Sequence, residues 1–399
     1  MIPFTEAFDI VDRETPRLPA ERVRLDEAVG RVLAADITAD TDMPPFDRSQ
    51  MDGFAVRAAD TERAPVSLQI VGESAAGRSW SGQVENGEAV RIMTGARVPA
   101  GADAVQQLEL TSENSGPDKV DVLEPVKPGR SIVLKGAEVV AGTCVFAAGE
   151  RISANMVAAI AAFGYSSVEV GTRPSVSILS TGSEIVRIDE MPGPDQIRNS
   201  NAPMIAAFVT ACGGAARQLP LVHDDAEQLS IAIGAAAARS DILVITGGVS
   251  VGKYDLTKDV LRSLGAEIFF ERVKLKPGKP TVFGRLGDTL VFGLPGNPVS
   301  AAVTFQLFVR RAIAKMQGAR DISLAAGFAA AAHKVKGTAE RDSFLPAGLG
   351  TDESARTVAT PLKWLGSSDF VGFARADALI YVPAGQSHEA GDIVRTFRI

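Results

Sequence analysis

Apolar residues recur at helical spacing near the amino terminus. Phe4, Phe8 and Val11 are spaced for one face of a helix, and Pro16 ends the run. Asp26 occupies the N-cap position of a second apolar run, as expected at the start of a helix. The pattern therefore predicts two short helices within the first forty residues.

The pattern changes between residues 64 and 150, where short β-prone runs alternate with turns rich in glycine and proline. No helical period is present in this stretch. The runs cover residues 66–71, 89–93, 119–123 and 144–147. We therefore expect a small all-β insertion.

Strand and helix patterns alternate from Pro174 to about residue 317. Buried strands are expected at residues 176–179, 242–245 and 290–292, and a further helix precedes them at residues 153–163. The expected N-caps of the helices in this stretch are Asn201, Asp224, Asp255 and Asn297. Such alternation predicts an α/β domain with a doubly wound, mostly parallel sheet.

The β pattern returns after residue 325, with runs at residues 332–335, 357–360, 378–382 and 393–397. These runs predict a small C-terminal β-domain. A chain of 399 residues is too long for one ordinary core, so about two to four domains are expected.

The charge balance narrows the class of ligand. The formal net charge is −7, whereas a nucleic-acid partner requires a basic surface. We therefore expect no nucleic-acid partner, although a local basic pocket could still hold a small anion.

Cysteine and histidine are too few for several kinds of site. The two cysteines, Cys144 and Cys212, provide neither a disulfide framework nor a zinc site. The three histidines, at positions 223, 333 and 388, have no metal-binding spacing. The amino terminus lacks a signal-peptide pattern, and no apolar run reaches the roughly 18 residues of a membrane span. We expect a cytoplasmic protein that does not associate with membranes.

Four loops directly follow strands of the expected sheet, at residues 180–184, 223–225, 246–255 and 293–298. Ligands of open parallel sheets bind outside the carboxyl ends of the strands. The topology should therefore gather Glu184, Asp224, Asp225 and Asp255 at one edge, beside a glycine-rich turn and a helix start.

These groups suit a phosphorylated ligand and a divalent metal. Exposed amides of a glycine-rich turn bind phosphate, and carboxylates bind Mg²⁺. Three lysines between residues 274 and 279 add positive charge that could bind a second anion. The run from Gly247 to Lys253 resembles a phosphate-binding P-loop, but Tyr254 stands where that motif needs Ser or Thr, which indicates a different anion loop.

Each element also has a purely structural interpretation. Asp224 and Asp255 could serve only as helix caps, and residues 293–298 could form only a strand–helix turn. The lysine segment could be a solvated loop. Asp52-Gly53 could be a hairpin turn, with no part in catalysis.

Eight strings of residues occur in the same order as in one known family, over nearly the whole chain. They are PPFDRSQMDGFA (44–55), RIMTGARVPAGADAV (91–105), STGSEI (180–185), IRNSN (197–201), HDD (223–225), TGGVSVGKYD (246–255), KPGKP (276–280) and LPGNPVSA (294–301). By these strings the chain resembles the molybdopterin molybdenumtransferases of the MoeA/gephyrin family.

The resemblance implies a multidomain fold and a homodimer. The implied parts are a discontinuous linker domain (1–50 and 140–172), a β-rich insertion domain (51–139), a molybdopterin-binding-like α/β domain (173–322) and a C-terminal β-barrel (323–399). Members of the family form elongated dimers whose active cleft lies between protomers.

The implied reaction belongs to molybdenum cofactor biosynthesis. Adenylylated molybdopterin and molybdate react with the help of Mg²⁺ or another divalent cation, the adenylate is cleaved, molybdenum stays on the dithiolene, and AMP is released. The implied protein partners are the upstream adenylyltransferase and proteins that deliver the cofactor to molybdoenzymes.

The resemblance also assigns roles to individual residues. The implied catalytic residues are Asp52, Asp224, Asp255 and Glu184, the last three also holding the metal. The implied binding residues for pterin nucleotide and molybdate are Thr94, Thr181, Gly182, Gly247, Gly248, Ser250, Gly252, Lys276, Lys279, Pro295, Gly296, Asn297, Pro298, Ser300 and Arg341.

The chain departs from the family pattern at two places. Gly136-Ala137-Glu138 stands where the family usually has Gly-Glu-Asp, with an upstream arginine replaced by an apolar residue, and Arg48 stands where a smaller polar residue or lysine is common. Two other functions remain open at this point. One is a molybdopterin adenylyltransferase or nucleotide hydrolase of the same fold, and the other is a non-enzymatic scaffold.

Overall fold

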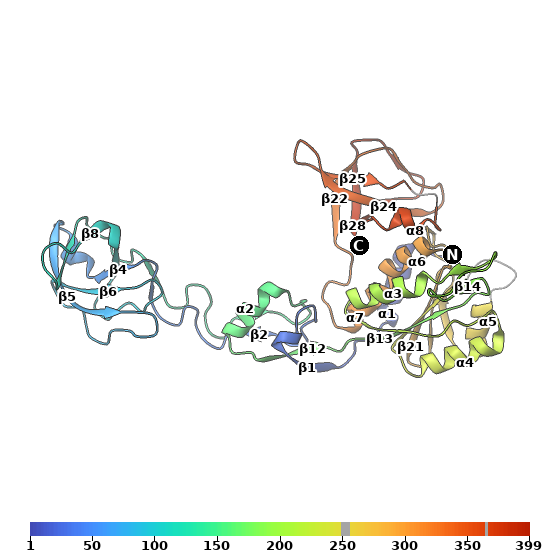
Figure 1. Ribbon diagram of the computed structural model, residues 1–399, viewed down its shortest axis with the longest axis horizontal. Coiled ribbons are helices and arrows are strands. Elements are labelled where there is room, and N and C mark those ends of the chain that lie inside the picture. The colour runs from blue at the N-terminus through green and yellow to red at the C-terminus, as the bar shows by residue number, and fades with distance from the viewer. Residues whose placement is uncertain (249–255, 364–365) are drawn as a thin grey trace. The chain divides into compact units, whose positions relative to one another are not determined.

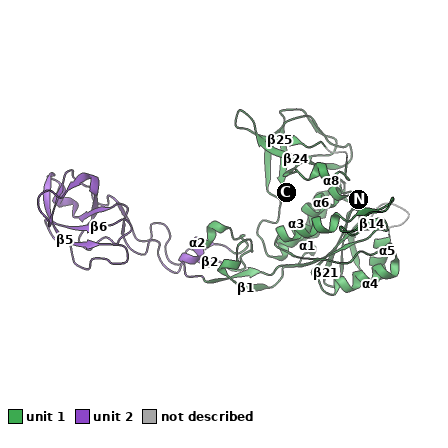
Figure 2. Cartoon of the chain, viewed as in Figure 1, with its two compact units in different colours: residues 1–35, 148–157, 166–399 green, residues 36–147, 158–165 purple. Residues whose placement is uncertain are grey.

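The computed structural model describes residues 1–248, 256–363 and 366–399. The chain forms two compact units, shown in two colours in Figure 2. The first contains residues 1–35, 148–157 and 166–399, and the second contains residues 36–147 and 158–165. The finer division into four domains stays a prediction. Within the described ranges, no helix is both long and apolar enough to cross a bilayer.

A six-stranded sheet forms the centre of the first unit. Its order is β16 (Ala215–Gln218), β13 (Ser175–Ser180), β17 (Ile242–Thr246), β21 (Thr289–Leu294), β20 (Val282–Leu286) and β18 (Glu267–Phe270). The first four strands are parallel, and the last two run antiparallel to their neighbours. The strands β17 and β21 are buried throughout, which is why their sequences read as continuous apolar runs.

Helices cover both faces of this sheet, as Figure 1 shows. One face carries α1 (Phe4–Glu14), α3 (Asn201–Ala211), α6 (Pro298–Thr304) and α7 (Arg310–Met316), the last two joined by a π-helical segment at Phe305–Val309. The other face carries α4 (Ala226–Ala237) and α5 (Leu256–Ser263). The doubly wound α/β arrangement is therefore confirmed.

The C-terminal residues form a closed β-sheet in the same unit. The order is β19 (Leu275–Lys276), β24 (Asp342–Thr351), β25 (Thr357–Pro361), β22 (Ala326–Ala331), β28 (Ile393–Arg398) and β26 (Ala378–Val382). Because β24 also pairs with β26, the sheet closes on itself as a barrel. The segment with the three lysines, residues 274–279, contributes β19, which places Lys276 beside Ser343 of the barrel. Smaller elements nearby are β23 (Val335–Lys336), β27 (Ser387–His388) and α8 (Phe370–Phe373).

The second unit contains the expected β insertion. Its sheet has the order β7 (Ala104–Gln107), β4 (Gly53–Val56), β6 (Glu88–Ile92), β5 (Val66–Ser74), β9 (Lys119–Val122) and β8 (Thr111–Ser112). Its core includes Phe54, Leu68 and Val120. A side chain at Gly53 would place Cβ 1.9 Å from the Gln106 carbonyl oxygen, so only glycine fits there.

Short strand pairs and 3₁₀ turns complete the two units. The pairs are β1 (Ala20–Arg24) with β12 (Ser167–Gly171), β2 (Ile37–Thr38) with β11 (Cys144–Phe146), β3 (Arg48–Ser49) with β10 (Ile132–Val133), and β14 (Ile185–Val186) with β15 (Ile197–Arg198). The 3₁₀ turns are Leu25–Glu27, Ala58–Thr61 and Leu108–Leu110. The helix expected at residues 153–163 is α2 (Ala154–Ala162).

Two expectations about secondary structure were wrong. No α-helix follows Asp26. Gly30 adopts a φ of +82° that ends any helical run, and Val32 and Leu33 form β-bridges with Arg151 and Val170. Residues 332–335 mostly form a bend between β22 and β23. The long strand β24 gave no clear pattern in the sequence because Pro346, Gly348 and Gly350 interrupt it.

Candidate functional site

Three neighbouring parallel strands end at one edge of the α/β sheet. The loops after β13, β17 and β21 carry Thr181, Gly247 and Pro295. The hydroxyl groups of Ser180 and Thr246 lie 2.9 Å apart at the ends of β13 and β17. The predicted gathering of the strand-end loops is thus present in the structure.

The glycines after β17 are required by close backbone packing. Gly247 has a φ of +94°, and a Cβ there would lie 2.1 Å from the Thr181 carbonyl oxygen. Gly248 has a φ of +62°, and its Cβ would lie 2.3 Å from the Thr257 hydroxyl. Both positions therefore admit glycine only, and they bring the backbone of this turn against the loop after β13.

Asp224 has a different role from the one its helix-cap interpretation implied. The N-cap of α4 is Asp225, whose carboxylate accepts a hydrogen bond of 2.8 Å from the Gln228 backbone N–H. Asp224 instead accepts a 2.9 Å hydrogen bond from the Thr181 hydroxyl. The expectation that Asp224 caps this helix was wrong, and its carboxylate belongs to the strand-end edge.

Glu184 lies close to the same loop. A Cβ built on Gly182 would lie 2.6 Å from Oε2 of Glu184, so the carboxylate sits directly over the glycine backbone. The carboxylates of Glu184 and Asp224 therefore both lie at the 181–184 loop, Glu184 as part of it and Asp224 through its bond to Thr181. Within the described residues, no group of three or more His, Cys, Asp or Glu side chains is arranged to hold a metal.

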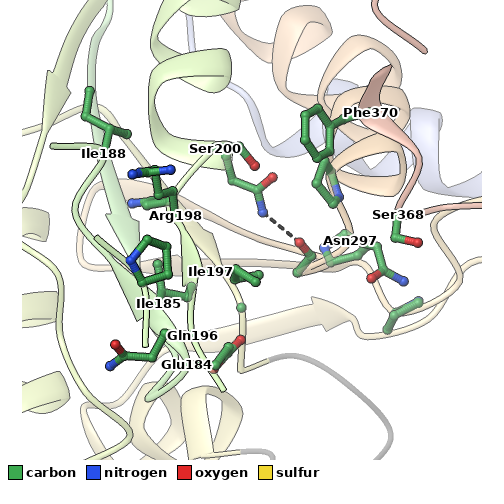
Figure 3. A pocket seen from close by; sticks show the side chains of 18 residues that line it. Glu184, Ile185, Ile188, Gln196, Ile197, Arg198, Ser200, Asn297, Ser368 and Phe370 are labelled. Carbon is green, nitrogen blue, oxygen red and sulfur yellow. Dashed lines mark hydrogen bonds between the residues drawn. The ribbon is translucent and has the colours of Figure 1, made fainter. Parts of the chain in front are cut away.

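A cleft of about 890 Å³ opens beside this edge, shown in Figure 3. Six residues assigned from the resemblance line it: Glu184, Gly247, Pro295, Gly296, Asn297 and Pro298. The residues that line it without a binding role assigned from the sequence are Ile185, Ile188, Pro192, Gln196, Ile197, Arg198, Asn199, Ser200, Asn201, Pro280, Ser368 and Phe370.

Two asparagines fix the walls of this cleft. The carboxamide oxygen of Asn199 accepts a 3.1 Å hydrogen bond from the Ala202 backbone N–H, so it caps the first turn of α3. Asn201, expected to be that cap, instead donates a 2.7 Å hydrogen bond to the Gly296 carbonyl oxygen. This bond is the dashed line in Figure 3, and it ties the start of α3 to the loop after β21.

A second cleft, of about 650 Å³, adjoins the first and shares Pro280, Pro295 and Asn297 with it. Besides Pro295 and Asn297, four further residues assigned from the resemblance line it: Lys276, Lys279, Ser300 and Arg341. Lys336, Leu345 and Ser367 also line it, although no motif in the sequence marks them. None of the described residues lining this cleft is acidic, so we call it the basic cleft.

Strand pairing explains how the basic cleft forms. Because β19 pairs with β24, the lysine segment lies beside the start of the C-terminal barrel. Arg341 directly precedes β24. Asn297 occupies the N-cap position of α6, as expected, but its side chain donates a 2.9 Å hydrogen bond to the Ser367 hydroxyl instead of capping the helix.

Asp52 and Thr94 belong to the second unit, where the structure brings them together. The Asp52 carboxylate accepts hydrogen bonds from the Thr94 backbone N–H (2.6 Å) and hydroxyl (2.9 Å). These bonds lower the pKa of Asp52 below its ordinary value, because they favour the charged carboxylate. The two family departures also meet here, since Arg48 donates a 3.0 Å hydrogen bond to Glu138.

Three residues assigned from the resemblance, Ser250, Gly252 and Asp255, lie outside the described residues. Among the residues missed, Arg198 and Asn199 lie in a string already matched to the family, which was a usable signal. Phe370 offered no such signal, because α8 is too short to show a helical period.

Comparisons with known proteins agree with this architecture. Three family models match consecutive parts of the chain: the MoeA N-terminal region (domain I and II) at residues 2–164, the probable molybdopterin binding domain at 177–315, and the MoeA C-terminal region (domain IV) at 329–396.

Relatives match the chain over its whole length. It is 35% identical to the molybdopterin molybdenumtransferase of Bacillus subtilis over 100% of this chain and 94% of the relative, and 33% identical to that of Staphylococcus aureus strain MSSA476 over 98% and 94%. Two crystal structures of the molybdopterin biosynthesis MoeA protein from Pyrococcus horikoshii superpose with TM-scores of 0.82 and 0.87. Their sequences are 32% and 30% identical to this one. Each match covers 100% of this chain, and the matches cover 99% and 100% of the two solved chains. The chain therefore belongs to the MoeA family of molybdopterin molybdenumtransferases.

Proposed function

We propose that this chain completes the molybdenum cofactor by transferring molybdenum from molybdate to adenylylated molybdopterin, with release of AMP. The observation that carries the proposal is the pair of adjoining clefts. One has a carboxylate and strand-end loops, and the other has basic residues and no acidic one among the described residues. A substrate with phosphates and a separate oxyanion matches this division.

The basic cleft suits molybdate. Lys276, Lys279 and Arg341 supply positive charge, and the Ser300 hydroxyl stands at the first turn of α6, where backbone N–H groups also favour anions. Holding a tetrahedral dianion beside the pterin sulfurs would convert its encounter with them into an intramolecular step.

The strand-end edge suits a divalent cation that comes with the nucleotide. Mg²⁺ usually keeps several waters and takes one or two carboxylates plus substrate phosphates, so a site with Asp224 and Glu184 fits without a third carboxylate. The hydroxyl of Thr181 orients Asp224, and the Gly182 backbone supports Glu184. When bound, the cation would neutralise charge on the phosphoanhydride and polarise its phosphorus. For Asp255 we keep the role that the family resemblance implies.

We also infer a homodimer in which Asp52 acts in the partner's cleft. Support comes from the family resemblance and from the Asp52–Thr94 pair, which presents an exposed, ionised carboxylate on the second unit. Mixing Asp52→Ala with Asp224→Ala subunits should then restore activity at one cleft of each mixed dimer. At random assortment about half of the dimers are mixed, so roughly a quarter of wild-type activity should return. Mixed dimers without activity would contradict this inference.

Reconstitution with purified protein tests the proposed function. Adenylylated molybdopterin, molybdate and Mg²⁺ should yield AMP together with cofactor that activates a molybdoenzyme apoprotein. If the protein instead consumes ATP when molybdopterin is the only other substrate, it is an adenylyltransferase. ATP hydrolysis without any pterin would indicate a nucleotide hydrolase. A protein inactive in all three reactions would be a scaffold. The cytoplasmic location and the upstream and delivery partners stay predictions.

A further inference from the structure

Large apolar side chains are exposed on both sides of the first cleft. Ile188 is 63% exposed, Ile197 61% and Phe370 51%, although all three line the cleft. Figure 3 shows Phe370 on one side and Ile188 on the other, with Ile197 between them. Clustered apolar side chains that face a concave site are typical of ligand contacts.

The structure holds Phe370 firmly in place. Phe373, one turn later in α8, is buried in the main core, and the Asp369 carboxylate caps the helix through the Gly372 N–H at 2.9 Å. The preceding segment is fixed as well, because the Ser367 carbonyl accepts a 3.0 Å hydrogen bond from the Val299 N–H. An anchored ring loses little conformational freedom when a ligand binds.

The opposite wall is also built from paired backbone. The Ile197 N–H donates to the Glu184 carbonyl at 2.8 Å, and the Asn199 N–H donates to the Val186 carbonyl at 2.9 Å. Arg198 is held by a 3.0 Å hydrogen bond to the Glu190 carbonyl. The isoleucines are therefore presented by an ordered loop, and together with Phe370 they form what we call the ring slot.

We propose that the ring slot binds the flat heterocycle of the nucleotide substrate, with Phe370 as the residue that determines its affinity. This inference rests on the proposed function. The slot lies in the first cleft, which shares Pro280, Pro295 and Asn297 with the basic cleft. One ligand can therefore place a ring against the apolar walls and its phosphates at the strand-end edge, while molybdate occupies the basic cleft. Apolar and aromatic walls favour a ring over a phosphate, because desolvating a charge there is costly.

Two rings of the substrate share this chemistry, adenine and pterin, and two probes separate them. AMP and a water-soluble pterin monophosphate are each titrated into the full-length protein by calorimetry. Phe370→Ala should weaken binding of one probe by about fivefold or more, the lower end of what loss of a stacking aromatic causes. Phe370→Trp should retain the affinity, and Phe370→Leu should restore only part of it.

The matched control is Phe328→Ala. Phe328 is 72% exposed on β22 and lines neither cleft, so its loss removes the same side chain without touching the slot. A shift in AMP affinity identifies adenine as the ring in the slot, and a shift in pterin affinity identifies the pterin. A wild type that binds neither probe, or Phe370→Ala affinities equal to those of Phe328→Ala for both, would overturn the inference.

The turnover assay separates this inference from the proposed function. If wild-type protein releases AMP in a molybdate-dependent reaction while Phe370→Ala keeps the wild-type KM for the adenylylated substrate, only the ring slot is wrong. If the wild type releases no AMP at all, the proposed function fails. The molybdate dependence of Phe370→Ala should stay that of the wild type, since the basic cleft lies outside the slot.

Discussion

Asp224 and Asp225 are adjacent and chemically identical, yet the structure assigns them separate roles that mutation can distinguish. Asp225 caps α4 through the Gln228 N–H at 2.8 Å, whereas Asp224 accepts the Thr181 hydroxyl at 2.9 Å at the strand-end edge. We therefore expect Asp224→Asn to lose activity with little loss of stability, and Asp225→Ala to lose stability with little loss of activity.

The expected magnitudes follow from these contacts. Loss of the Asp225 cap should cost about 1 kcal/mol of unfolding free energy. Asparagine at position 224 keeps an acceptor for Thr181, and the site is exposed, so its stability cost should stay below about 1 kcal/mol. If the negative charge of Asp224 positions the cation and phosphates, AMP release should fall by at least about 100-fold, equivalent to roughly 2.7 kcal/mol of transition-state stabilisation.

Both variants can be measured by the same two assays. AMP release from adenylylated molybdopterin, followed by chromatography at saturating molybdate, gives turnover, and denaturant unfolding gives stability. Folded Asp224→Asn protein with near wild-type turnover would refute the catalytic assignment of Asp224. Loss of turnover in Asp225→Ala alone would mean that the two roles are exchanged.

Two further predictions concern the basic cleft and the second unit. Replacing Lys276 and Lys279 by alanine should raise the molybdate concentration for half-maximal activity by about tenfold or more, because charge-assisted hydrogen bonds to the anion are lost; Lys274→Ala, exposed and outside the cleft, is the control, and an equal shift there would contradict the assignment. Thr94→Val should raise the pKa of Asp52, followed by NMR titration, because it removes the hydroxyl donor. A carboxyl whose pKa is lowered by folding stabilises the fold at pH values above the ordinary aspartate pKa, and this stabilisation is lost on acidification. The variant should therefore lose less stability as the pH falls below the ordinary aspartate pKa. An unchanged Asp52 pKa in the variant would contradict the hydrogen bond from the Thr94 hydroxyl.

The sequence predicts secondary structure best where burial dictates the choice of residues. The strands β13, β17 and β21 stand in a sheet covered on both faces, so their apolar runs and the loops after them are legible from the chain alone. The sequence cannot distinguish Asp224 from Asp225, because the backbone conformation at the helix start decides which one caps. The second N-terminal helix fails for a related reason, since the β-bridges of Val32 and Leu33 to distant segments outweigh local helix propensity.

Contacts between distant segments are the part that sequence reasoning missed. Arg48 and Glu138 each depart from the family pattern, and the pairing of β3 with β10 and the β-bridge between Met43 and Val139 bring their segments together into an ion pair. Phe370 gains its position from Phe373 in the core and from the loop after β21, neither of which leaves a periodic signal. Such residues become visible only when the packing is known.

On the proposed function, this one chain couples cleavage of the adenylate to insertion of the metal. The most direct test measures AMP released and molybdenum bound to pterin in the same reaction, while molybdate is titrated from zero. We expect both products to appear in equal amounts with the same half-saturating molybdate concentration, and neither to appear when molybdate is absent. Full AMP release without molybdate, or molybdenum-bound pterin without AMP, would contradict it.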